Sequence, residues 1–397
     1  MGAIDIHAHL RDQGLAYKED FVTGTTAAAS GGITMVVDMP NNKPVTMSLE
    51  SLRERMRLAK RRTLVNLAFY SAFPSRIEEM RWIIKEGGAF GFKCFMSQKI
   101  GGISPLDEEN LLRAFREASK IKASIAVHAE DKEMMEVKLK EVKRLRVKGL
   151  PAYLKVHSSE VEEKAVEKVL KLTEETGVHV HFCHVSSAAG IKAISKAKRS
   201  GLPVTCEVTP HHLLLTSQHL KRLGFLALTN PPLRLDEDVR ALWSAIYERV
   251  IDVISSDHAP HTVEEKKSGS VWDVKPGFPG FETMLPLLLT QVNAGQLTLS
   301  ALVRLTSEKP SEVFGIRRRG GIIDGNYADL TIVDMKEEYE IDSSEFYSKA
   351  KYSPFDGWKV KGRPVKTFIN GQLVMEEGEI VAKPGSGRII TQGKLRS

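Results

Sequence analysis

Short apolar runs alternate with amphipathic stretches up to about residue 256, and this alternation constrains the fold more than any other feature. The runs have the length and composition of buried strands, and helical spacing of apolar residues fills most of the intervals between them. The expected strands are Ala3–His7, Thr34–Asp38, Leu64–Phe69, Phe90–Phe95, Ser124–His128, Val178–His184, Pro203–Val208 and Val250–Ser255. Eight strand–helix repeats over roughly 250 residues are typical of a (β/α)8 barrel, so the sequence predicts an α/β fold of the TIM-barrel type.

Helices are predicted where apolar residues recur at intervals of three and four. Such stretches include Leu49–Lys60, Arg76–Lys85 and Glu109–Ser119. Ser159 and Glu162 have the spacing of a capping box, in which each side chain bonds the backbone N–H at the other position. We therefore expect a further helix to begin at Ser159, with the Glu162 carboxylate bonded within its first turn.

The pattern changes after about Arg319, where short alternating runs replace the strand–helix repeat. The runs are Ala328–Asp334, Lys366–Ile369, Gln372–Met375 and Glu379–Ala382. Asn370-Gly371 separates two of them and is a strong signal for a β-hairpin. We expect two units, a barrel over residues 1–319 and a small β-module over residues 320–397 that packs on the barrel.

Composition excludes several classes of protein. The chain has 397 residues, of which 42% are hydrophobic, and no apolar run approaches the roughly 18 residues that a membrane-spanning helix needs. Three cysteines are too few for a disulfide framework, and the first residues lack the features of a signal peptide. The net charge of +7 is spread along predicted helices, which indicates solvated helix faces and not a nucleic-acid interface. We expect a soluble, cytoplasmic protein with no membrane or nucleic-acid partner.

The first predicted strand carries a His-x-His motif. Side chains alternate along a strand, so His7 and His9 point to the same side, into the barrel at the strand's carboxyl end. Two neutral imidazoles that converge there suit a borderline metal such as zinc. His179 and His181 repeat the motif, but they begin their strand and belong to the opposite end of the barrel, where we expect a structural role.

Other residues of metal-ligand type follow later strands. His128 ends the fifth predicted strand, His184 ends the sixth, and Asp257 follows the eighth. These strand ends all meet at one mouth of a barrel, where barrel enzymes hold their active sites. A single histidine at a strand end is more often a hydrogen-bonded core residue, but the whole set favours a metal site.

Lys93 lies within an apolar strand, where a buried ammonium is costly. Reaction of its amine with CO2 would produce a carboxylate able to bridge two cations. The alternative is an unmodified lysine that extends toward solvent or pairs with an acid. The residues alone favour the unmodified lysine.

These residues lie in motifs that together resemble the dihydroorotases of the amidohydrolase superfamily, over nearly the whole chain. The sequence is similar to the archaeal enzymes and to the dihydroorotase domain of the animal multifunctional pyrimidine-synthesis protein. The motifs are Asp5-Ile-His-Ala-His-Leu-Arg-Asp12, Asp38-Met-Pro-Asn-Asn42, Gly91-Phe-Lys-Cys-Phe95, Val127-His-Ala-Glu130, Phe182-Cys-His-Val-Ser186, Val204-Thr-Cys-Glu-Val-Thr-Pro-His-His212, Asn230-Pro-Pro-Leu-Arg234, Ser256-Asp-His-Ala-Pro-His261, Pro276-Gly-Phe-Pro-Gly-Phe-Glu-Thr-Met-Leu-Pro286 and Tyr352-Ser-Pro-Phe-Asp-Gly-Trp-Lys-Val-Lys-Gly362. Members usually carry several dozen residues before the His-x-His strand, which here begins near residue 3. We therefore expect either a reduced β-sandwich built from the tail alone or a start that is internal to the natural gene.

The resemblance implies a binuclear zinc centre with Lys93 carboxylated by CO2 and bridging the two ions, which reverses the interpretation of Lys93 from the residues alone. The implied ligands are His7, His9, Lys93, His128, His184 and Asp257. Some members hold a third zinc through a cysteine and a later glutamate, which match Cys183 and Glu207. A buried thiol and a paired carboxylate are the alternative for these two residues, and both interpretations stay open.

The resemblance also implies how the substrate is held. Dihydroorotate carries a carboxylate, which calls for a fixed cation with planar donors. Arg11 follows His9 by two residues, on the same side of the strand. The other implied contacts are Asn41, Asn230, His261 and the backbone of Pro276 and Gly277. Dihydropyrimidinases share the metal ligands but usually place a tyrosine just after the lysine motif, where this chain has Ser97-Gln98-Lys99.

By the same resemblance, Asp257 would act as general base and then acid. The reaction would be the reversible cyclisation of N-carbamoyl-L-aspartate to L-dihydroorotate with release of water, in pyrimidine (UMP) biosynthesis. The implied partners are a second copy of the chain in a homodimer and aspartate carbamoyltransferase. Two rival functions are another cyclic-amide hydrolase, such as allantoinase or dihydropyrimidinase, and an inactive relative that scaffolds aspartate carbamoyltransferase. Inactive relatives lose metal ligands, whereas this chain keeps all six, which favours the enzyme.

Overall fold

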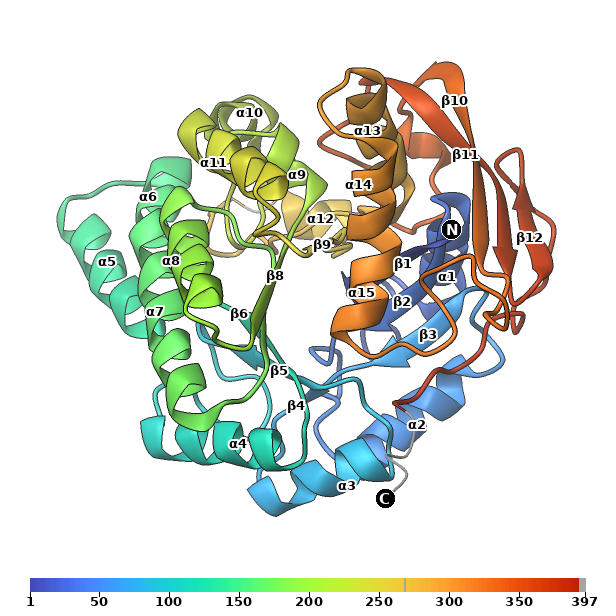
Figure 1. Ribbon diagram of the computed structural model, residues 1–397. Helices are drawn as coiled ribbons and strands as arrows, with labels where there is room; N and C mark the ends of the chain where they lie inside the picture. Colours follow the sequence, from blue (N-terminus) through green and yellow to red (C-terminus); the bar gives the residue numbers. More distant parts are fainter. Residues whose placement is uncertain (268, 393–397) are drawn as a thin grey trace.

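The computed structural model describes residues 1–267 and 269–392, and its centre is a barrel of parallel strands in sequence order (Figure 1). The strands are β1 (Ala3–Ala8), β2 (Ile33–Asp38), β3 (Asn66–Phe69), β4 (Ser71–Ala72), β5 (Phe92–Phe95), β6 (Ile125–His128), β7 (Val180–Phe182), β8 (Val204–Val208) and β9 (Val253–Ile254). β3 and β4 are two parts of one strand, interrupted at Tyr70. The N–H of His9 donates to the His258 carbonyl at 2.8 Å beyond β9, so the eight predicted strands close into a barrel.

Helices surround the barrel, as the predicted alternation requires (Figure 1). They are α1 (Phe21–Ser30), α2 (Leu49–Ala59), α3 (Met80–Lys85), α4 (Glu108–Lys120), α5 (Lys132–Arg144), α6 (Gly149–Val156), α7 (Ser159–Thr176), α8 (Ala188–Arg199), α9 (Pro210–Leu214), α10 (Ser217–Leu223), α11 (Asp236–Tyr247), α12 (Val263–Lys266), α13 (Phe281–Asn293), α14 (Leu299–Val303) and α15 (Lys309–Val313). The predicted helix Arg76–Lys85 is divided, because a 3-10 turn over Ile77–Glu79 precedes α3. A π-helical turn over Arg304–Glu308 joins α14 to α15.

Two apolar layers stabilise the barrel. Outward-facing strand residues such as Val36 belong to one cluster with helix residues such as Phe21. Inward-facing residues such as Ile4 and Val253 form a separate cluster inside the barrel, to which Phe314 after α15 is added. Each such buried side chain contributes about 1.5–3 kcal/mol. The barrel interior is therefore a packed core, and the carboxyl ends of the strands are where a barrel holds its active site.

Glu162 does not form the predicted capping box. The N-cap of α7 is Ser158, whose side chain makes no capping hydrogen bond. The Glu162 carboxylate instead accepts hydrogen bonds from the N–H groups of Ser186 (3.2 Å) and Ser187 (2.9 Å), and it lies 3.6 Å from Arg234. The prediction was wrong because the carboxylate finds partners in distant parts of the chain, where it holds the loop that follows β7.

The tail forms an antiparallel sheet on the outside of the barrel. Its strands, in spatial order, are β10 (Leu330–Glu340), β11 (Lys359–Ile369), β12 (Gln372–Glu376) and β13 (Glu379–Ile380). The predicted hairpin is confirmed, because Asn370 and Gly371 have φ values of 52° and 86°, as a type I′ turn requires. The division at residue 319 stays a prediction, and a buried ion pair between Arg319 and Asp329 (2.7 Å) joins its two sides.

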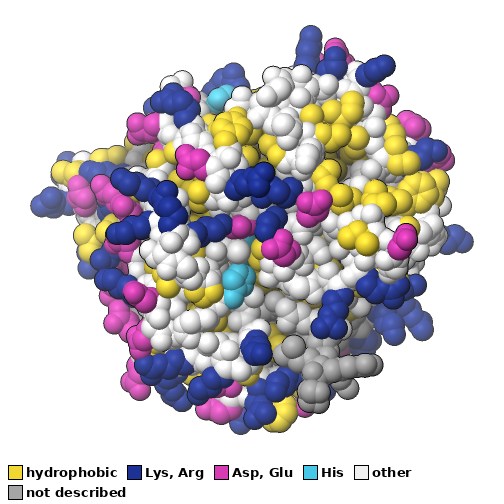
Figure 2. All heavy atoms as spheres, in the orientation of Figure 1, with side chains coloured by type: hydrophobic (Ala, Val, Ile, Leu, Met, Phe, Trp, Pro, Cys, Tyr) yellow, Lys and Arg dark blue, Asp and Glu magenta, His cyan; other side chains and the backbone are white. Residues whose placement is uncertain are grey.

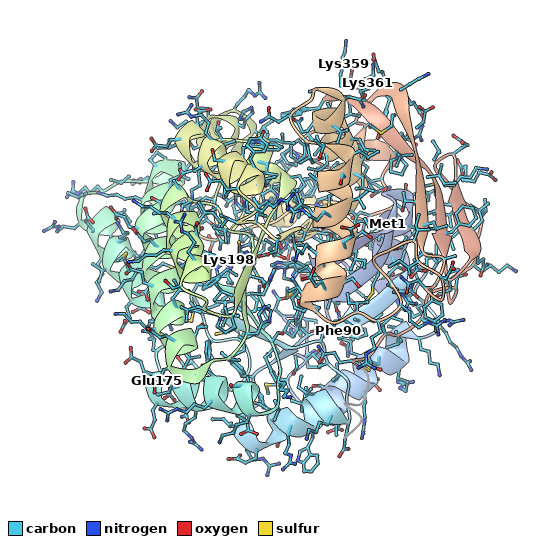
Figure 3. All side chains as sticks on the ribbon, in the orientation of Figure 1. Met1, Phe90, Glu175, Lys198, Lys359 and Lys361 are labelled. Atoms are coloured by element: carbon cyan, nitrogen blue, oxygen red, sulfur yellow. The ribbon has the colours of Figure 1, made fainter. Side chains whose placement is uncertain are left out.

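Charged side chains of both signs cover the outer surface. On the face drawn in Figure 2, Lys and Arg side chains are interspersed with Asp and Glu. Lys359 and Lys361 lie at the start of β11, at one end of the β10–β13 sheet (Figure 3), and Lys361 pairs with Glu338 at 2.7 Å. Such exposed pairs contribute about 0–1 kcal/mol each. Within residues 1–267 and 269–392, no helix has both the length and the apolarity to cross a membrane.

The end of the described chain returns to the barrel wall, which the sequence analysis did not predict. The N–H of Leu67 in β3 donates to the Arg388 carbonyl at 2.9 Å, and the Leu67 carbonyl accepts from the N–H of Ile390 at 2.8 Å. Ile390 also packs against the cluster inside the barrel. This terminal segment therefore extends the wall beside β3.

Asn66 connects the terminal segment to the rest of the fold. Its buried side-chain amide donates to Asp329 (2.9 Å), and its oxygen accepts from the Asn370 amide (3.0 Å) and the Arg388 N–H (3.2 Å). We expect Asn66→Ala to lower the free energy of unfolding by about 2–4 kcal/mol, because buried partners lose their hydrogen bonds. Denaturant titration measures the change. The exposed amide variant Gln372→Ala should change it by less than about 0.5 kcal/mol, and a similar small loss for Asn66→Ala would contradict the connecting role.

Candidate active site and metal centre

The structure brings the predicted histidine and aspartate ligands together at the mouth of the barrel. The Nε2 atoms of His7, in β1, and of His9, the residue after β1 ends, lie 3.4 and 3.3 Å from Oδ1 of Asp257. Nδ1 of His128, the last residue of β6, lies 3.1 Å from Nε2 of His184, which follows β7. The ring centroids of His7 and His184 are 5.1 Å apart, so the two groups adjoin.

Two of these residues have a strained backbone. His184 and Asp257 have φ values of 34° and 47°, which side chains other than glycine seldom adopt. Such a conformation costs about 1–3 kcal/mol and persists where the surrounding structure holds it. Strain at two predicted ligand positions, both beside His7, is typical of a functional site.

The outer nitrogen of three of the four rings contacts an oxygen acceptor. The pairs are His7 Nδ1 with Glu207, His9 Nδ1 with Asn41 Oδ1 (2.7 Å) and His128 Nε2 with Glu130 Oε2 (2.9 Å). Nδ1 of the fourth ring, His184, has no hydrogen-bond partner among the described residues. If the nitrogen that contacts the oxygen carries the proton, the other ring nitrogen, which faces the cluster, keeps a free lone pair. This is the usual arrangement around histidine metal ligands.

The electrostatics of the cluster suit a cation. Burial lowers the pKa of His9 to about 4, so this ring is neutral. Burial and a nearby ammonium lower the pKa of His7, but the Glu207 and Asp257 carboxylates outweigh them and raise it to about 10. Burial raises the pKa of Asp257, but His7 and His9 outweigh it and hold that pKa below its usual range. The carboxylates therefore favour a positive charge at this point, which a divalent cation supplies.

Lys93 does neither of the two things expected of an unmodified lysine. Its side chain is 1% exposed, and its Nζ lies 2.9 Å from Sγ of Cys183. None of the carboxylates in the described part of the chain forms an ion pair with it. Lys93 is therefore a buried amine without an acid partner that lies beside the predicted metal ligands.

Cys183 and Glu207 lie close to His7. One potential ligand atom from each of the three buried residues lies within 4.8 Å of the other two. Oε2 of Glu207 also lies 3.2 Å from Nε2 of His181. His181 therefore supports the site through Glu207, although its motif predicted a structural role at the far end of the barrel. His179, the other ring of that motif, bonds hydroxyl groups.

A cavity of about 210 Å³ opens over these ligands, and every predicted substrate contact lines it. Those residues are Arg11, Asn41, Asn230, His261, Pro276 and Gly277. Nη2 of Arg11 lies 3.1 Å from Nε2 of His261, and Nε donates to the Pro260 carbonyl at 3.2 Å. Burial, then Arg11, lowers the pKa of His261 to about 3, so the ring is neutral and accepts from Arg11. Nη1 of Arg11 makes no hydrogen bond to the described residues, so it is free to bind an anion in the cavity.

Sequence reasoning missed the residues that support the site from behind. The Glu130 carboxylate is fully buried and contacts both His128 Nε2 and His157 Nδ1 (2.8 Å). The ring of Tyr153 stacks on His157 with centroids 4.2 Å apart, and its hydroxyl donates to Asn230. One chain of contacts thus links a predicted metal ligand, His128, to a predicted substrate contact, Asn230. The position of Glu130, two residues after His128, was the only signal for it in the sequence.

Known proteins that resemble this chain along most of its length belong to one family. The model of the amidohydrolase family matches residues 1–374. The dihydroorotase of Methanothermobacter thermautotrophicus is 40% identical over 98% of this chain and 86% of that protein. The dihydroorotase of Pyrococcus furiosus is 39% identical over 100% of this chain and 86% of its own length. That of Bacillus cytotoxicus is 37% identical over 95% of this chain and 86% of its own length.

Solved structures share the same fold. The L-hydantoinase (dihydropyrimidinase) of Arthrobacter aurescens superposes with a TM-score of 0.94 at 34% identity, over 98% of this chain and 88% of that one. The dihydropyrimidinase of Brevibacillus agri has a TM-score of 0.90 at 26% identity, over 98% of this chain and 87% of that one. Because the family model spans most of the sequence and dihydroorotases align along nearly all of it, this chain belongs to the amidohydrolase family, among the dihydroorotases.

Proposed function

We propose that this chain is a zinc-dependent dihydroorotase that cyclises N-carbamoyl-L-aspartate reversibly to L-dihydroorotate, with release of water, in pyrimidine biosynthesis. The position of Arg11 carries the proposal. Arg11 is 7% exposed as a residue and lines the cavity above the predicted ligands, two residues after His9. A cyclic amide alone needs no buried guanidinium, whereas a ring carboxylate is recognised by one.

Two zinc ions per chain fit the residues present. His7, His9 and Asp257 would hold one ion, and His128 and His184 would hold the other. Zinc bound here supplies Lewis-acid chemistry, which activates water and polarises the ring amide carbonyl.

Lys93 is the residue proposed to bridge the two ions. Its neutral amine would form an N–C bond with CO2 and release a proton, which produces a carbamate with two ligand oxygens. The buried position of this amine, 2.9 Å from Cys183 Sγ and without an acid partner among the described residues, supports this modification.

The chain's own residues would move protons and hold the ring. In hydrolysis, Asp257 takes a proton from the attacking water and delivers it to the ring nitrogen as the amide bond breaks. In the biosynthetic direction the carbamoyl nitrogen attacks the side-chain carboxyl carbon and Asp257 takes the nitrogen's proton. As the C–O bond breaks, Asp257 returns that proton to the departing oxygen, which takes a second proton from solvent and leaves as water. Arg11 would hold the ring carboxylate throughout, with Asn41, Asn230, His261 and the Pro276–Gly277 backbone around the ring.

A third cation position lies at His7, Cys183 and Glu207, whose ligand atoms are within 4.8 Å of one another. The alternative is that Cys183 is a buried thiol and that Glu207 serves only as the hydrogen-bond partner of His7. Zinc content decides between them. If the third site exists, the wild-type chain should hold one zinc ion more than the Cys183→Ser variant. Equal zinc content in the two proteins would contradict a third site.

Glu130 should control metal affinity through His128. We expect Glu130→Gln to raise the zinc dissociation constant about 10–100-fold, because an amide cannot accept from both His128 and His157. Competition with a chromogenic chelator measures this constant without reference to activity. Glu133→Gln, on the exposed side of α5, is the matched control and should leave zinc affinity unchanged. Equal affinities in the two variants would show that Glu130 does not support the metal.

The rival function is hydrolysis of an uncharged cyclic amide, favoured by the likeness to the Arthrobacter L-hydantoinase. At the place where dihydropyrimidinases usually have a tyrosine, Ser97 and Gln98 line this cavity instead. A panel of dihydroorotate, allantoin, hydantoin and dihydrouracil tests the proposal. We expect kcat/KM for dihydroorotate to exceed the others by about 100-fold, and a preference for any uncharged ring would overturn it.

The family likeness also leads us to propose two partners, a second copy of this chain and aspartate carbamoyltransferase. Sedimentation of the chain alone, and then with aspartate carbamoyltransferase, tests both.

A further inference from the structure

Lys266, the last residue of α12, has a buried ammonium that is satisfied by carbonyl groups alone. Its side chain is 1% exposed, and its Nζ donates to the carbonyls of Leu228 (3.0 Å), Lys275 (3.1 Å) and Gly277 (2.8 Å). Three N–H groups therefore meet three acceptors, which only the protonated amine can supply. No carboxylate in residues 1–267 and 269–392 forms an ion pair with it.

The three carbonyls belong to two loops that both line the substrate cavity. Leu228 lies two residues before Asn230, while Lys275 and Gly277 flank Pro276. The loops also contact each other directly, because the N–H of Gly277 donates to the Leu228 carbonyl at 2.8 Å. The ammonium thus lies where the two loops and α12 converge.

The Pro276–Gly277 loop has little room to adjust. Gly277 has a φ of 122°, and a Cβ at this position would lie 2.6 Å from the Ala259 carbonyl oxygen. The backbone therefore passes close to its neighbour on one side while Lys266 holds it on the other. A loop fixed in this way can present its peptide groups to a ring at a constant distance.

A stabilising role alone does not account for this lysine. Burial lowers the pKa of Lys266 to about 7, which reflects the cost of keeping the charge away from water. Apolar side chains fill such positions at least as stably as buried charges do. Residues that lower stability, such as a buried charge, are concentrated at functional sites, where they fix the geometry of the site.

We propose that Lys266 is a positioning residue for the reaction, and that its ammonium holds the Asn230 loop and the Pro276–Gly277 loop at one separation so that both contact the ring together. Lys266 acts through backbone carbonyls and does not touch the substrate. The identity of that substrate rests on the proposed function, whereas the connection between the loops rests on the three hydrogen bonds.

The test compares Lys266→Met and Lys266→Arg with Lys267→Met, which removes the exposed lysine next in the chain. We expect Lys266→Met to lower kcat/KM for dihydroorotate about 30-fold, mainly through KM, because small misplacements of binding groups have large kinetic effects. Zinc per chain should stay unchanged. Lys266→Arg should recover part of the loss, and Lys267→Met should remain within about twofold of wild type.

Hydrogen exchange provides a readout that needs no substrate. The amide of Gly277 should exchange faster in Lys266→Met than in Lys267→Met, because its loop is no longer held against Leu228. Exchange that is unchanged, or a kcat/KM within threefold of wild type per folded molecule, overturns the proposal even if stability falls. If Lys266→Met does not fold, Lys266→Gln is judged by the same criteria. A wild-type chain inactive on dihydroorotate would refute the proposed function, while the exchange comparison would still decide the role of Lys266.

Discussion

Asp257→Asn should lower kcat for dihydroorotate about 10³–10⁴-fold while zinc content stays close to that of the wild type. The asparagine keeps an oxygen where Oδ1 lies 3.4 and 3.3 Å from the His7 and His9 nitrogens, so a metal ligand remains. Its amide cannot take the proton from the attacking group or return it to the departing one, which removes both proton transfers. Steady-state kinetics and metal analysis on the same preparation measure the two quantities.

The matched control is Asp252→Asn, at the opposite end of the same strand. Asp252 pairs with Lys198 (2.7 Å), labelled at the end of α8 in Figure 3, and lies away from the mouth of the barrel. We expect its turnover to remain within about threefold of wild type, since it has no part in the chemistry. Near-normal turnover in Asp257→Asn would remove Asp257 from its role as base and acid.

Arg11→Met should abolish the preference for the charged ring. We expect kcat/KM for dihydroorotate to fall about 100-fold, since charge-assisted hydrogen bonds to a buried guanidinium are worth about 1.5–3 kcal/mol each. The value for dihydrouracil should change less than about threefold, because that ring has no carboxylate for Arg11 to hold. Parallel kinetics on the two substrates check the prediction.

Arg11→Lys separates charge from geometry. A lysine keeps the positive charge but lacks the planar fork, so its kcat/KM for dihydroorotate should lie between those of wild type and Arg11→Met. Equal losses on dihydroorotate and dihydrouracil in Arg11→Met would show that the arginine supports the fold of the cavity and does not recognise the carboxylate.

The barrel and the inner part of the site could be predicted because their signals are local. A short apolar run in the sequence indicates a buried strand. The carboxyl ends of parallel strands meet at one end of a barrel, whatever the length of the segments that connect them. His128, His184 and Asp257 could therefore be assigned to one mouth without knowledge of any contact. The structure places them there, together with His7 and His9.

The supporting residues could not be predicted, because their partners come from distant segments. Glu130 gains its role only when His157 reaches it across the fold, and Lys266 only when two loops converge on its ammonium. Glu162 shows the converse error. Its spacing from Ser159 matched a capping box, but the carboxylate accepts from the N–H groups of Ser186 and Ser187 instead.

Lys93 and the terminal segment mark two other limits. A lysine that reacts with CO2 looks in the sequence like any lysine in an apolar strand, so only the family resemblance suggested its modification. The segment around Ile389 makes a single bridge to Leu67 and has no run of alternating residues, so nothing marked it as part of the barrel wall.

Anomalous X-ray diffraction at the zinc edge, from crystals of the wild-type chain grown with zinc and bicarbonate, tests the central claim most directly. We expect two strong peaks within about 4 Å of each other at the mouth of the barrel, one beside His9 and Asp257 and the other beside His128 and His184, with carbamate density on Lys93 between them. Zinc bound elsewhere, or a mouth that holds no metal under these conditions, would contradict the account.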